Sequence, residues 1–166
     1  VKPPLVVGYF RHGSHPARRL RLTRALQDDL MLAGGDDHEV SYDTAGQMAG
    51  FVRFVHEQRR ARLLVTRAEW NRAPSRRAAV DYVRALVASA GHIEEIDEVL
   101  LASEQLPADA TLLVEWHVLR ADHLAFEHLD AARAVARLRE SAASLGTAGA
   151  ILLARAVEIE DALIGN

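Results

Sequence analysis

The stretch Pro4-Leu-Val-Val-Gly-Tyr-Phe-Arg-His-Gly13 brings an arginine, a histidine and a glycine directly after an apolar run. A short apolar run of this kind is typical of a strand that is buried in a parallel sheet. In open α/β sheets, ligands bind at the carboxyl ends of the strands. We therefore expect Arg11 and His12 to lie at a functional site.

The rest of the first half alternates apolar runs with amphipathic segments. The pattern predicts helices over 17–32, from Thr44 onward, and from Pro74 to Gly91, with strands over 39–42 and 62–66. Strands that are separated by helices favour an α/β fold. We expect a small, mostly parallel sheet with helices on both faces, over residues 1–100.

The second half favours helices. A long helical stretch is expected from Asp109 to about Ser144, and an amphipathic helix after Gly146. The segments 92–97 and 111–116 fit either a strand or a helix. We expect one domain over 1–166, in which 101–166 form a mostly helical extension that offers a homodimer contact through its helices.

Composition limits the classes of protein that remain. The 166 residues include no cysteine, which excludes disulfides and thiolate metal sites and favours the cytoplasm. No apolar run approaches the roughly 18 residues that a membrane span needs, and no signal-peptide pattern is present. We expect a cytoplasmic protein with no membrane partner.

Charge is distributed unevenly along the chain. Residues 1–90 hold 15 Lys and Arg against 9 Asp and Glu, whereas residues 91–166 hold 5 against 14. Arginine suits bidentate contacts to phosphate, so the first half has the charge to bind an anion such as DNA or a phosphorylated small molecule. Clusters such as Arg76-Arg77 fit either a phosphate-binding surface or solvated helix ends.

The order of elements and Gly8-Tyr9-Phe10-Arg11 resemble the N-terminal domain of resolvase/invertase-type serine recombinases. That family has a Gly-Tyr-x-Arg-x-Ser pattern at the end of its first strand. Here Gly13 occupies the serine position, and Ser14 follows one residue later. The resemblance also implies roles for Asp43 after the second strand and for Arg67 after the third. It further implies that the family's long dimerisation helix falls within 109–144.

The missing serine changes what this resemblance implies. Recombination needs a hydroxyl that attacks a phosphodiester, with arginines to neutralise the developing charge. Displacing a hydroxyl by one residue at a strand end turns it in another direction. The resemblance therefore implies a degenerate domain that acts through protein or DNA contacts without cleaving DNA.

Arg11-His12-Gly13 also resembles the signature of the histidine phosphatase superfamily. This alternative implies that His12 is the nucleophile, that Arg11 and Arg72 hold the phosphoryl oxygens, and that Glu104 is the general acid. His117, after the apolar run 112–114, corresponds to the second histidine of that family. The two resemblances differ at position 12, because only the phosphatase needs a histidine there.

Other motifs predict no cofactor and no metal. The chain has neither a phosphate-binding P-loop nor a GxGxxG turn after a strand. His117, His123 and His128 are separated by six and five residues, whereas ligands on one face of an α-helix are three or four residues apart. Solvated or capping roles are expected for these histidines.

Overall fold

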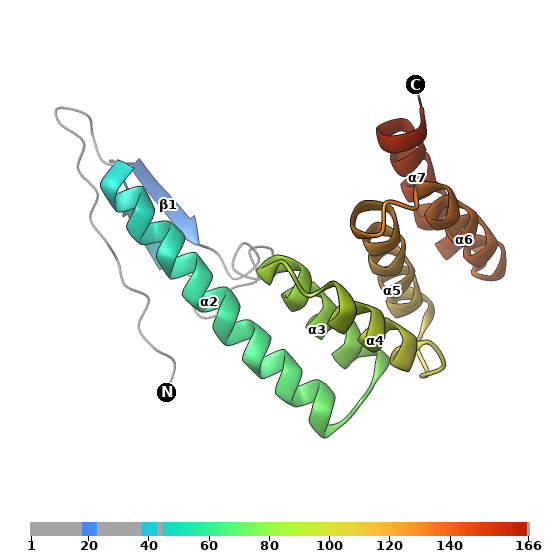
Figure 1. Cartoon of the computed structure of the whole chain (residues 1–166), viewed down its shortest axis with the longest axis horizontal. Coiled ribbons are helices and arrows are strands. Elements are labelled where there is room, and N and C mark those ends of the chain that lie inside the picture. The colour runs from blue at the N-terminus through green and yellow to red at the C-terminus, as the bar shows by residue number, and fades with distance from the viewer. Residues whose placement is uncertain (1–17, 23–37, 43–44, 166) are drawn as a thin grey trace. The chain divides into compact units, whose positions relative to one another are not determined.

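The computed structural model describes residues 18–22, 38–42 and 45–165, and it describes side chains over 55–165 (Figure 1). The chain divides into two compact units. The first consists of Val1–Ala68 and Ala88–Ala90, and the second of Glu69–Val87 and Gly91–Asn166.

The first unit contains a pair of strands and most of a long helix. Strands β1 (Arg18–Leu22) and β2 (His38–Tyr42) pair antiparallel, with Arg18 opposite Tyr42. Helix α2 (Ala45–Arg72) begins immediately after Thr44, where a helix start was expected. The strand expected over 39–42 is confirmed. The helix expected over 17–32 is wrong for 18–22, which form β1, and its remaining residues lie outside the described part of the chain.

The expected α/β fold with a parallel sheet is wrong. Residues 55–165 contain helices and no strand, and the two strands in the described part of the chain are antiparallel. The strand expected over 62–66 lies within α2, because no glycine or proline interrupts the chain between Gly50 and Pro74. Its apolar run also follows helical spacing, since Leu63 is buried while Leu64 and Val65 are more than half exposed.

The second unit is a helical bundle. Its helices are α3 (Arg76–Ser89), α4 (Ile93–Ser103), α5 (Ala110–Asp122), α6 (Ala131–Ser144) and α7 (Gly149–Ile159). The segments 92–97 and 111–116 fall mainly in α4 and α5. Of the strand and the helix that their sequences both fit, the helix is therefore observed. Two side chains start helices as N-caps: Asp109 accepts the Leu112 backbone N–H at 2.8 Å, and Asp130 accepts that of Arg133 at 3.1 Å.

Small residues form much of the core between α5, α6 and α7. Helices α6 and α7 lie side by side, and α5 packs against both (Figure 1). The buried cluster consists of Val114, Ala121, Ala125, Ala134, Val135, Leu138, Ala142, Leu152, Ala156 and Ile159. Five of these ten residues are alanines, and short side chains let helices approach closely.

Polar side chains connect α3, α4 and α5 beside that core. The indole N–H of Trp116 donates to Ser103 Oγ at 2.9 Å, and both side chains are fully buried. Arg76, only 5% exposed, donates to the backbone oxygens of Glu104 and Leu106 at 2.6–3.1 Å. Its guanidinium carbon lies 4.5 Å from the centre of the Trp116 ring. These bonds satisfy the carbonyls of the residue that caps α4 and of the loop that follows it.

None of the helices described by the structure has the length and apolar character needed to cross a membrane.

Candidate metal centre

A π-helical turn joins α5 to the loop before α6. It spans His123–Glu127 and is closed by the bond from the His128 backbone N–H to the His123 carbonyl oxygen, 3.2 Å long. In an α-helix, residues five apart point about 140° away from each other. A π-turn contains more residues, so it brings residues five apart together. The rings of His123 and His128 accordingly lie 4.9 Å apart, edge to face.

Both imidazoles face one carboxylate from α4. Nε2 of His123 lies 2.8 Å from Asp97 Oδ1, and Nε2 of His128 lies 2.8 and 2.9 Å from the two Asp97 oxygens. One potential ligand atom from each residue lies within 4.8 Å of the others. Two imidazoles and a carboxylate form a common ligand set for Zn²⁺ and for non-haem iron.

The cluster lies at the edge of the bundle. The His123 side chain is only 2% exposed, whereas those of Asp97 and His128 are 44% and 38% exposed. Nδ1 of His123 is buried without a hydrogen-bond partner in the described part of the chain. Nδ1 points away from Asp97, since the His123 ring faces that carboxylate through Nε2.

Two opposing effects act on the Asp97 carboxyl. Burial raises its pKa, and hydrogen bonds from His128 and His123 lower it. The second effect prevails, so the pKa of Asp97 lies below its ordinary value. The carboxyl is therefore ionised at neutral pH and can serve as a ligand.

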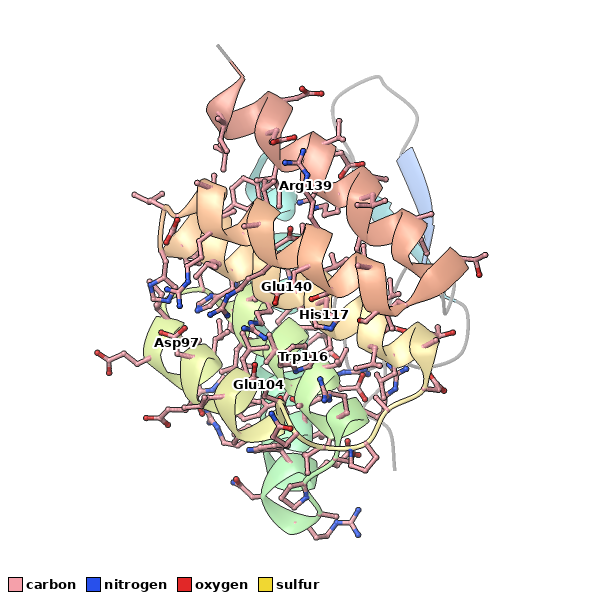
Figure 2. The ribbon with its side chains drawn as sticks, turned by 90° about the vertical axis from the view of Figure 1, so that its right-hand side faces the viewer. Asp97, Glu104, Trp116, His117, Arg139 and Glu140 are labelled. Atoms are coloured by element: carbon pink, nitrogen blue, oxygen red, sulfur yellow. The ribbon has the colours of Figure 1, made fainter. Side chains whose placement is uncertain are left out.

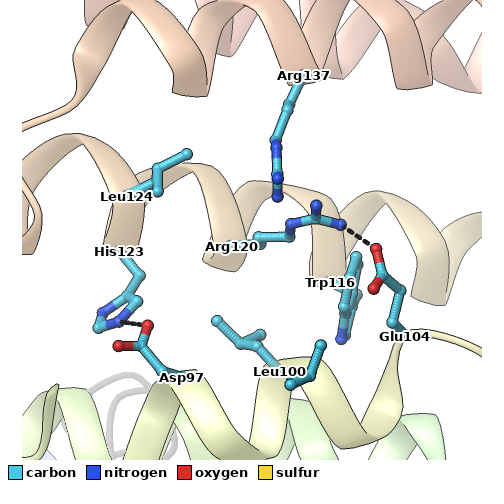
Figure 3. Close-up of a pocket in the computed structure, with 9 residues that line it drawn as sticks. Asp97, Leu100, Glu104, Trp116, Arg120, His123, Leu124 and Arg137 are labelled. Atoms are coloured by element: carbon cyan, nitrogen blue, oxygen red, sulfur yellow. Dashed lines mark hydrogen bonds and ion pairs between the residues drawn. The ribbon is translucent and has the colours of Figure 1, made fainter. Parts of the chain in front are cut away.

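A pocket of about 210 Å³ adjoins the cluster, with Asp97 and His123 in its lining (Figure 3). Leu100 and Leu124 contribute apolar wall, and Trp116 and Arg120 line the part near Glu104. Arg120 is paired with Glu104 at 2.9 Å. Figure 2 also shows Glu104 close to Trp116. Two of the three candidate ligands, Asp97 and His123, therefore face a cavity large enough for a small molecule.

The first unit contains most of the residues that the two family resemblances imply at a site. Arg11, His12, Ser14 and Asp43 lie outside the described residues. Arg67 lies within α2, among the residues of the first unit. The structure therefore leaves the recombinase and phosphatase assignments as predictions, while the strand that both place over 62–66 is helical.

Three residues expected in the phosphatase alternative lie in the second unit. Arg72 is the exposed last residue of α2, Glu104 follows α4, and His117 is half-buried in α5. Burial lowers the pKa of His117, the positive charge of Arg76 lowers it further, and Glu104 partly opposes both effects. The charge of Glu104 therefore acts on the imidazole of His117. His117 lies in a helix rather than in the late strand that the family resemblance required.

The cluster of Asp97, His123 and His128 was not expected from the sequence. His123 and His128 were expected to point apart, because an α-helical period was assumed through the π-turn. The one available signal was Asp130, whose N-cap position requires the preceding helix to end near His128. Asp97 had no such signal, because it meets the histidines only through the packing of α4 against the end of α5.

The chain matches no protein-family model, no curated protein and no solved structure.

Proposed function

We propose that the helical second unit binds a divalent transition metal, such as Zn²⁺, through Asp97, His123 and His128. The observation that supports this function is the convergence of two imidazole nitrogens on one carboxylate at 2.8–2.9 Å. Donor atoms around a tetrahedral metal with bonds of about 2.1 Å are about 3.4 Å apart. Small side-chain movements therefore suffice to admit the ion.

Three protein ligands leave a coordination position for another molecule. Closed structural zinc sites have four protein ligands, whereas sites with two histidines and one carboxylate keep a position open for water or substrate. Asp97 and His123 line the neighbouring pocket, so this open position has a cavity beside it. The proposed class is thus a metal-dependent ligand-binding or catalytic protein, rather than one in which the ion only stabilises the fold.

Calorimetric titration of the metal-free chain with Zn²⁺ tests the proposal. We expect one ion per chain. Replacing a ligand should lower the affinity for Zn²⁺ at least about 100-fold. Loss of a residue that only hydrogen-bonds to a metal ligand already lowers it about 10- to 100-fold. Asp97→Asn and His128→Asn are the test variants. Co²⁺ in place of Zn²⁺ should give visible absorption bands that Asp97→Asn alters.

Two matched controls separate this site from general surface binding. Glu98→Gln removes an exposed carboxylate from the residue next to Asp97. His92→Asn removes another surface histidine that faces a carboxylate, since its Nδ1 lies 3.6 Å from Glu95. Both controls should bind Zn²⁺ as the parent chain does. Retention of 1:1 binding with parent affinity in Asp97→Asn would overturn the proposal.

A further inference from the structure

The Arg137 side chain points from α6 into the pocket beside Asp97 and His123 (Figure 3). It is half-buried, and its guanidinium has no ion pair or hydrogen bond to any residue that the structure describes. Arg120, which lines the same pocket, is already paired with Glu104. Arg137 is therefore a partly desolvated cation with five unused donors, and its geometry suits a planar anion.

The charges of the pocket lining also favour an anion once a metal is present. Asp97 and Glu104 balance Arg120 and Arg137, so the lining is neutral apart from its histidine. A bound divalent ion makes it positive. A carboxylate can then interact with the ion through one oxygen and with Arg137 through the other.

The walls and the size restrict the ligand further. Leu100, Leu101 and Leu124 give the pocket an apolar side. Its volume of about 210 Å³ is below the roughly 300–1,000 Å³ of sites for drug-sized ligands. A short apolar body with one carboxylate fits this combination better than a multiply charged phosphate, because only one arginine is unpaired.

A second pocket of about 360 Å³ in the same unit lacks these features. Its lining includes Arg84 and Glu115, which form an ion pair at 3.3 Å. That pocket therefore offers no unpaired charge for a ligand.

We propose that the pocket between α4, α5 and α6 binds a small aliphatic carboxylate, which pairs with the Arg137 guanidinium through one oxygen while its body lies against the leucines. This inference deepens the proposed function and rests on it for the second contact, which the metal supplies. Arg137 acts here as a binding residue, and no chemical step is assigned to it.

Titration of the Zn²⁺-loaded and metal-free chain with isobutyrate tests the inference. We expect isobutyrate to bind the loaded chain at least about 10-fold more tightly than isobutyramide, its neutral isostere, because a charge-assisted hydrogen bond is lost with the amide. Arg137→Gln should weaken isobutyrate binding by about 10-fold or more while leaving Zn²⁺ affinity unchanged. The matched control is Arg133→Gln, an exposed arginine one turn earlier in α6, which should change neither.

The possible results separate this inference from the metal proposal. Normal Zn²⁺ binding with no preference for isobutyrate over isobutyramide, or with no effect of Arg137→Gln, would overturn the carboxylate inference alone. Tighter binding of inorganic phosphate than of isobutyrate would also overturn it. If Zn²⁺ does not bind, but isobutyrate binds the metal-free chain and Arg137→Gln weakens that binding, the metal proposal is overturned and the carboxylate site is kept. No isobutyrate binding in either form overturns the inference.

Discussion

Arg76 holds the end of α4 against α3, although arginine is usually a surface residue. It is 5% exposed and donates three hydrogen bonds to two backbone oxygens, while neighbouring Arg77 pairs with Glu115 at the surface. We expect Arg76→Ala to lower the free energy of unfolding by about 2–4 kcal/mol, because the carbonyls of Glu104 and Leu106 lose their donors and the buried side chain is removed. Arg77→Ala should cost less than about 1 kcal/mol. Urea unfolding of both variants measures the difference, and equal losses would contradict this account.

His117 should make the fold sensitive to acid. Burial and the charge of Arg76 lower its pKa in the folded state. As pH falls through about 6.5, the ordinary histidine pKa, the unfolded chain takes up a proton that the folded chain still excludes. The free energy of unfolding must then fall as pH falls. We expect the parent chain to lose more stability between pH 7.5 and 5.5 than His117→Gln does, as measured by urea unfolding; identical losses would refute the prediction.

Leu129 occupies a backbone conformation that costs energy in a leucine. Its φ is 55°, and its side chain is 83% exposed, so it gains little from packing. Glycine adopts this conformation without the Cβ penalty. Leu129→Gly should therefore raise the free energy of unfolding by about 1 kcal/mol. The control Leu101→Gly removes a leucine that is 73% exposed within α4. It should lower the free energy of unfolding by about 1 kcal/mol, because glycine is unfavourable inside a helix. A lower free energy of unfolding in Leu129→Gly would show that the backbone at this position costs the leucine no energy.

At the scale of elements, helix ends were easier to predict than strands. The start of α2, the end of α3 near Gly91 and the last helix after Gly146 follow from caps and breakers in the local sequence. Short apolar runs such as 63–65 fit a strand and a buried helical turn equally well, and only the surrounding residues decide. The metal cluster depends on a π-turn and on contacts between helices, neither of which local periodicity reports.

The contact between α6 and α7 provides a test at this scale. A Cβ added at Gly149 would lie 3.0 Å from the Cα of Ala142 and still closer to its carbonyl oxygen. Gly149→Ala should therefore push the two helices apart and cost about 1–3 kcal/mol. It should also lower the temperature of thermal unfolding measured by circular dichroism. An unchanged midpoint would show that the helices do not approach as closely as described.

For the whole molecule, the second unit has a core of its own between α5, α6 and α7, and the metal cluster lies at the edge of that core. A ligand that binds only the folded form stabilises it by about 2.7 kcal/mol at 100 times its Kd. For a chain of this size, we expect Zn²⁺ at that excess to raise the unfolding midpoint by about 5–10 °C. Asp97→Asn should show no rise in the same thermal scan. Equal rises in both proteins would place the ion elsewhere.

The π-turn has a consequence for how this chain can vary. His123 and His128 lie together because the turn at 123–127 holds more residues than an α-helical turn would. Loss of a single codon between the two histidines would leave them four residues apart, and ordinary α-helical winding would then still place both imidazoles on one face of the helix. An in-frame deletion of three nucleotides there would therefore preserve the pair of histidines, whereas the present spacing of five residues depends on the π-turn to bring them together.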